Sequence, residues 1–126
     1  MIAAVRRAYE ALSKGDFDAV IELADPDIEL VTTGGLTNVR GVDKVRAWME
    51  PETIEDLRMV AEHFEVAGDN VLVRTRSRGR GVESGIAVEM DFWAVWTIND
   101  AGLATRIVAF RNDEEAKARK ATGLSD

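Results

Sequence analysis

The sequence predicts an α+β fold in which N-terminal helices precede a curved antiparallel sheet that wraps around them as a cone. Apolar residues recur at helical spacing up to about residue 50, and from Leu57 onward they alternate with a period of two. A third observation concerns residues 88–98, where one side of a predicted strand is entirely apolar: Val88, Met90, Phe92, Ala94, Trp96 and Ile98. Such a face is typical of the wall of a hydrophobic cavity.

Two helices are predicted at the start of the chain. The apolar residues of Ile2–Leu12 follow helical spacing, and Gly15 stands where a helix is expected to end. Asp16 is positioned to cap a second, shorter helix, which we expect Pro26 to end.

A short strand and a third helix are expected next. Ile28–Thr32 is apolar at alternate positions and predicts the strand, and Gly34-Gly35 predicts a loop after it. The third helix is expected over 42–50, because Pro51 disfavours helical geometry in the residue before it.

The second half of the chain predicts strands separated by turns, and then one more helix. The predicted strands are 57–66, 70–80, 85–98 and 104–111. Asn112 and Glu115 have the spacing of a capping box for the final helix, and Gly123 is expected to close it. The chain shows no linker, so a single domain is expected over 1–126.

The two central strands are expected to form a hairpin. A turn directly after Val82 places Arg76 opposite Glu89 and Arg74 opposite Asp91. The same register sets four arginines on one face: Arg74, Arg76, Arg78 and Arg80. The row is either an anion site or a ladder of ion pairs on the outer face, and the ladder is favoured because surface charges are usually solvated.

Composition limits the classes of partner. The 126 residues carry a net charge of −7, which disfavours nucleic acid and anionic membranes as partners. With no cysteine and one histidine, neither a metal nor another cofactor is expected, and a capped turn explains the acidic residues at 25–29. The N-terminus lacks the apolar core of a signal peptide and no run is long enough to span a bilayer, so a cytoplasmic protein is expected.

Several stretches resemble a known family. They are VRRAYEALSKGDFDAVIELADPDIEL near the start, the RG at 40–41, AGDNVLV, VWTIND and the ending RIVAFRNDEEAKARKATGL. This pattern resembles bacterial members of the SnoaL-like branch of the nuclear transport factor 2-like superfamily. The resemblance implies a cone with one deep apolar pocket, and often a homodimer through the outer sheet face, where Trp93 and Val95 fit an interface.

The resemblance also implies where catalytic groups are expected in related enzymes. Ketosteroid isomerases and many cyclases carry an acid or a histidine at the position of Ala94. The isomerases also carry a general base at the position of Thr32 and a phenol at that of Ala8, next to Tyr9. None of these three residues can transfer a proton, so isomerase chemistry of that type is disfavoured.

Three other residues are candidates for chemistry, each with an alternative. Tyr9 either points into the pocket or packs in the core with its hydroxyl at the rim. His63 has the strand parity of Met59, which allows it to reach the pocket, or it is structural. Arg111 either receives a carboxylate or enolate at the pocket mouth or pairs with the acids at 113–115. The expected ligand-binding residues are Tyr9, Thr32, Trp48, Met59, Thr75, Met90, Phe92, Ala94, Trp96 and Arg111.

These residues predict a protein that binds an apolar or aromatic small molecule. An enzyme of the polyketide cyclase, isomerase or dehydratase type is the alternative, and an association domain whose pocket is filled by its own side chains is a third. An epoxide hydrolase site would need Asp91 and Arg74 to face inward, which requires a bulge that shifts the strand parity by one.

Overall fold

The computed structural model describes residues 2–32 and 37–124, so the loop expected at Gly34-Gly35 lies outside the described residues. The elements in chain order are α1 (Ile2–Lys14), α2 (Phe17–Glu22), β1 (Ala24–Thr32), β2 (Asn38–Arg40), α3 (Val42–Met49), β3 (Ile54–Ala67), β4 (Asn70–Gly81), β5 (Ala87–Ile98), β6 (Ala104–Arg111) and α4 (Glu115–Thr122). The α+β class predicted from the sequence is confirmed.

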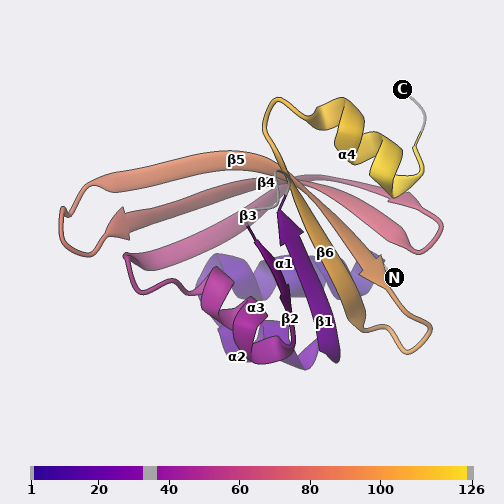
Figure 1. The fold of residues 1–126 in the computed structure, drawn as a ribbon, viewed down its shortest axis with the longest axis horizontal. Coiled ribbons are helices and arrows are strands. Elements are labelled where there is room, and N and C mark those ends of the chain that lie inside the picture. Colours follow the sequence, from indigo (N-terminus) through magenta and orange to yellow (C-terminus); the bar gives the residue numbers. More distant parts are fainter. Residues whose placement is uncertain (1, 33–36, 125–126) are drawn as a thin grey trace.

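The six strands form one sheet in the order β2-β1-β6-β5-β4-β3. Strands β3 to β6 make the expected antiparallel meander, but β1 runs parallel to β6, so the sheet is mixed. The strand β2 was not predicted, because three residues are too few to show a period. Since β2 and β3 are free edges, the curved sheet stays open and does not close into a barrel (Figure 1).

Helices cover both faces of the sheet. On the inner face α1 packs against β3 and α2, while α3 packs against β1 (Figure 1). The inner side holds the main core, to which α1, α2, α3 and all the strands except β2 contribute buried residues. On the outer face α4 lies across β4, β5 and β6 and covers a smaller apolar cluster. The sheet is therefore the middle layer between two unequal cores.

The register of the β4–β5 hairpin differs from the predicted one by two residues. Arg76 lies opposite Asp91, and Arg78 lies opposite Glu89. The reason is the turn: Gly85 adopts a φ of 67° and its N–H donates to the carbonyl of Gly81, which moves the centre of the loop toward the C-terminus. Because side chains alternate with a period of two, this shift leaves every residue on its predicted face.

Two helix boundaries also differ from the prediction. The helix α2 ends at Glu22, well before Pro26, and β1 already begins at Ala24. Asn112 does not cap α4, because the helix begins at Glu115 after Glu114; the carbonyl of Asn112 instead accepts a hydrogen bond from the Trp93 indole (3.2 Å). The expected end at Gly123 is confirmed, where a φ of 100° closes the helix.

Candidate functional site

The apolar face of β5 has two different environments. Phe92, Ala94, Trp96 and Ile98 are buried in the main core. Val88 and Met90 lie on the same face but are 40% and 57% exposed. The C-terminal half of the strand is therefore an inner wall, whereas the N-terminal half extends beyond the helices (Figure 1).

A buried polar group lies on this inner wall. The Tyr9 hydroxyl is 2.8 Å from Thr75 Oγ1 and accepts a hydrogen bond from Trp96 Nε1 (3.1 Å). The ring of Tyr9 meets that of Trp96 edge to face at 5.5 Å and that of Phe64 at 6.0 Å. Three of the residues predicted to bind ligand are thus brought together by α1, β4 and β5.

Burial controls the chemistry of Tyr9. Removal from water raises the pKa of the phenol to about 12, although the hydrogen bonds with Thr75 and Trp96 act in the opposite direction. The phenol is consequently neutral near pH 7, where it donates or accepts hydrogen bonds but cannot serve as a general base.

Other predicted pocket residues are part of the same packed interior. Met59 and Ala94 are buried, and Trp48 meets Phe92 edge to face at 6.3 Å. Thr32 has a local role, because its Oγ1 accepts a hydrogen bond from the Thr37 N–H (3.0 Å).

His63 follows the second of its two alternatives and does not reach the pocket. A bulge in β3 between Ala61 and His63 inverts the parity of the strand, so His63 lies on the outer face. The imidazole Nε2 lies 3.2 Å from the Glu65 carboxylate, and the side chain is 54% exposed. Nothing in the sequence marks this bulge, since the residues around it are ordinary strand residues.

Arg111 follows the second of its two alternatives. Its guanidinium is exposed and lies 3.4 Å from the Asp113 carboxylate and 3.6 Å from that of Glu114. The side chain belongs to the connection between β6 and α4 and not to the buried interior.

The arginine row forms the predicted ladder of ion pairs. Arg76 Nε lies 3.0 Å from Asp91 and 3.4 Å from Glu89, and Arg74 lies 3.6 Å from Asp91 and 4.9 Å above the Trp93 ring. The Arg76 guanidinium holds the pKa of the Asp91 carboxyl below its usual range. Since Asp91 and Arg74 lie on the outer face, the arrangement needed for an epoxide hydrolase is not formed.

The surface expected to form a dimer is covered within the chain itself. Trp93 and Val95 are buried in the outer cluster, where Ala118 of α4 packs against them. Their apolar character is thus explained by an intramolecular contact that the sequence did not reveal. Trp93 and Val95 are therefore not available to a partner.

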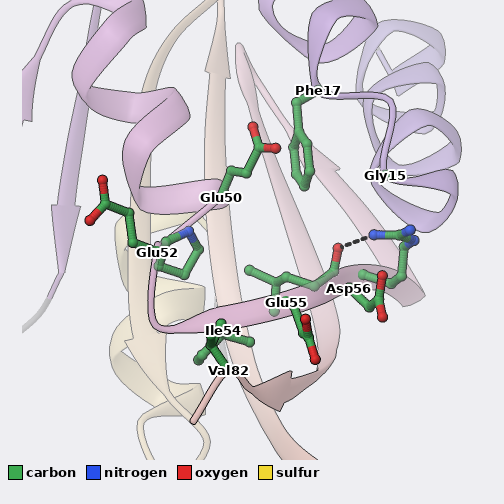
Figure 2. A pocket seen from close by; sticks show the side chains of 11 residues that line it. Gly15, Phe17, Glu50, Glu52, Ile54, Glu55, Asp56 and Val82 are labelled. Atoms are coloured by element: carbon green, nitrogen blue, oxygen red, sulfur yellow. Dashed lines mark hydrogen bonds between the residues drawn. The ribbon is translucent and has the colours of Figure 1, made fainter.

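A hollow of about 510 Å³ lies where the α1–α2 connection and α2 approach the α3–β3 connection and the start of β3 (Figure 2). Its lining residues are Gly15, Phe17, Glu50, Pro51, Glu52, Ile54, Glu55, Asp56, Leu57, Arg58 and Val82. Apolar side chains alternate there with carboxylates, and the Arg58 guanidinium donates to the carbonyl of Leu57 (2.8 Å). The sequence did not indicate this site, because its residues come from three segments that are far apart in the chain (15–17, 50–58 and 82).

A second hollow, of about 380 Å³, lies between α1 and β3. It is lined by Arg6, Tyr9, Glu10, Ser13, Val60, Ala61 and Phe64. Of the ten predicted ligand-binding residues, Tyr9 is the one that contributes to either hollow.

The described part of the chain holds neither a cluster of metal-ligating side chains nor a helix that could cross a membrane. No group of three or more potential metal-ligating side chains occurs within residues 2–32 and 37–124. Over the same residues, no helix combines the length and apolar character needed to cross a membrane.

The open mixed sheet, wrapped around helices on one face, defines a class of small α+β domains with an apolar interior. The chain belongs to the SnoaL-like domain family, whose model matches residues 5–107. No curated protein sequence matches it.

Solved structures share the fold. An NTF2-like protein of unknown function from Burkholderia pseudomallei is 22% identical, with a TM-score of 0.74 over 96% of this chain and 95% of that one. The Mycobacterium tuberculosis protein RV0760c, solved in complex with estradiol-17β-hemisuccinate, is 16% identical (TM-score 0.73; 88% and 92% covered). A putative polyketide cyclase from Xanthomonas campestris is 19% identical (TM-score 0.69; 90% and 91% covered).

Proposed function

We propose that this protein binds an apolar or aromatic small molecule without chemically transforming it. One observation carries this proposal: among the described buried residues the ionisable side chains are Tyr9 and Glu114, and Glu114 lies at the start of α4 on the outer face. The Tyr9 phenol is neutral near pH 7, and burial raises its pKa further. Acid–base catalysis needs a group beside the substrate that exchanges a proton near the working pH, and the buried interior offers none. The carboxylates that line the larger hollow (Glu50, Glu52, Glu55 and Asp56) are exposed to solvent.

The ligand is proposed to occupy the 510 Å³ hollow. The apolar floor of the hollow includes Phe17, which belongs to the main core, and Leu57, which packs against that core. Apolar side chains together with a few polar groups are the usual construction of a small-molecule site.

Structural relatives support the class of ligand. RV0760c was solved with a steroid ester, although at 16% identity the similarity concerns the fold alone. Folds of this kind carry many functions, so the ligand of this chain depends on its own residues.

An enzyme of the cyclase or isomerase type is a second candidate, and one observation favours it. Tyr9 lines the 380 Å³ hollow, so a substrate there could receive a hydrogen bond from the neutral phenol. In that case Tyr9→Phe abolishes turnover while binding in the larger hollow is retained. Product analysis by mass spectrometry after incubation with ring-forming polyketide substrates distinguishes the two candidates.

The binding proposal is tested by tryptophan fluorescence with a steroid, an aromatic quinone and a terpenoid. Saturable quenching by at least one of them is expected for the wild type, and Leu57→Glu should weaken it by about tenfold or more, since it places a charge on the apolar floor. Val66→Glu is the matched control, because Val66 lies on the same strand and outside both hollows. The absence of saturation with every compound, or equal affinity in Leu57→Glu, would contradict the proposal.

A further inference from the structure

Among the residues that the structure describes, nothing pairs with one edge of the N-terminal half of β5. Residues Ala87–Asp91 pair with β4 on one side, whereas β6 pairs with β5 only from Phe92 onward. Figure 1 shows this part of the β4–β5 hairpin projecting away from the helices. An unpaired strand edge presents free N–H and C=O groups to any second strand that approaches.

Exposed apolar side chains follow this edge. Ile86 is 66% exposed and shares a face with Val88 and Met90, which are 40% and 57% exposed. Clustered exposed apolar residues are typical of an interaction surface. On the other face Glu89 and Asp91 are paired with arginines of β4, so their charges are largely balanced.

The direction of the backbone groups is fixed by one hydrogen bond. The Gly81 N–H donates to the carbonyl of Ile86 (3.0 Å), so the peptide groups of even-numbered residues face β4. By alternation, those of Ala87 and Glu89 point outward from the free edge. A second strand can therefore form hydrogen-bonded pairs with odd-numbered residues and non-hydrogen-bonded pairs with even-numbered ones.

We propose that this edge pairs with the same edge of a second copy of the chain, antiparallel about a two-fold axis at Val88. Val88 then lies opposite the partner's Val88, Ile86 lies opposite the partner's Met90, and Ala87 lies opposite the partner's Glu89. The outward groups of Ala87 and Glu89 form the inter-chain hydrogen bonds, and the three apolar residues of each chain form one continuous row.

Charge selects this register. If the two-fold axis is moved one residue toward the C-terminus, Glu89 lies opposite the partner's Glu89, and like charges directly opposite each other are destabilising. If the axis is moved one residue toward the N-terminus, Met90 has no apolar residue opposite it. Pairing at Val88 is the arrangement that both matches the apolar row and separates the carboxylates.

The strand β3 is a longer edge of the same sheet but is less suited to pairing. It has bulges after Glu55 and after Ala61, and its edge region carries several charged side chains. Bulges and charges are the devices by which edge strands avoid pairing with other chains. The free part of β5 has no irregularity in its register with β4.

The chain contains no cysteine, which permits a direct test with single thiols. In a non-hydrogen-bonded pair the Cα atoms are about 4.5 Å apart, within the range of a disulfide. Val88→Cys is therefore expected to form a covalent dimer under mild oxidation, seen on a non-reducing gel. Val66→Cys, at a site on β3 that is 42% exposed, is the matched control and should stay monomeric.

Met90→Cys checks the register. Its two thiols would be separated by four residues along the strands, roughly 13 Å, so no disulfide is expected. Cross-linking of Met90→Cys in place of Val88→Cys, or of Val66→Cys as fast as Val88→Cys, overturns the proposal.

Sedimentation of the unmodified chain supplies the second measurement. A dimer is expected at tens of micromolar, and Met90→Glu should be monomeric with an unchanged circular dichroism spectrum, because the new charge lies against the partner's Ile86. A monomeric wild type, or a dimeric Met90→Glu, overturns the proposal.

Discussion

The two halves of β5 have the same alternating sequence but opposite environments. Phe92–Ile98 is flanked by β4 and β6 and packs against α1 and α3 on one face and α4 on the other. Among the described residues, Ala87–Asp91 has β4 as its one neighbouring strand. Trp96 is 4% exposed and Met90 is 57% exposed, although both lie on the same face of one strand. Alternation thus indicates the face of a side chain, while burial depends on which elements reach that face.

The largest expected difference between the two halves of β5 is the loss of unfolding free energy when one side chain in each half is truncated. Trp96→Ala removes the ring packed against Tyr9 and is expected to lower the free energy of unfolding by about 3–5 kcal/mol. Met90→Ala should change it by less than about 0.5 kcal/mol, as at other exposed sites. Chemical denaturation measures both, and comparable losses would contradict the contrast between the halves.

Removing the hydroxyl of Tyr9 from the inner wall should lower the free energy of unfolding by an intermediate amount. Tyr9→Phe leaves Trp96 Nε1 buried without its acceptor, which is expected to cost about 1–3 kcal/mol of unfolding free energy. The Thr75 hydroxyl retains a contact with the carbonyl of Val73 (3.4 Å). A loss no greater than that of Met90→Ala would show that the hydrogen bond to Trp96 contributes nothing.

The Tyr9 phenol also predicts that the stability of the protein depends on pH in the alkaline range. Burial raises the pKa of Tyr9 from 10.0 to about 12, so between these values the native state holds a proton that the unfolded state releases. The contribution of Tyr9 is therefore fully present below pH 10 and is lost as the pH rises to 12. The stability difference between wild type and Tyr9→Phe should narrow over this range, and a constant difference in urea denaturation would contradict it.

The smallest effect on stability is expected for a change on the outer face of the exposed half of β5, at Asp91. The pKa of Asp91 is lowered mainly by Arg76, so its ion pairs stabilise the native state above the ordinary aspartate pKa and are lost as the pH falls through the lowered value. Asp91→Asn should thus be slightly less stable than the wild type at neutral pH and equal to it in acid. A difference that persists in acid would have a cause other than the carboxylate charge.

Local signals predicted most of the fold. Helical spacing and the glycine at position 123 located the helices, and the alternation from Leu57 onward located β3 to β6 to within a few residues. Even the error in the β4–β5 register left each face correct, because it amounted to two residues. The ladder between β4 and β5 was likewise expected, since its charges alternate with the same period.

The candidate site was less predictable, because it depends on contacts between distant segments. The bulge after Ala61 turned His63 outward, and α4 covered Trp93 and Val95. The 510 Å³ hollow is assembled from the α1–α2 connection, α2, the α3–β3 connection with the start of β3, and the β4–β5 turn, none of which marks it alone.

The sequence by itself determined which residues are apolar, which face each occupies and which family the pattern resembles. Only the tertiary structure decided which of those faces are covered and which remain open. The physical reason is that periodicity is a property of one strand or helix, whereas burial requires a second element, and its position follows from packing of the whole chain. For β5 this divides a single apolar row into a filled inner wall and an exposed edge.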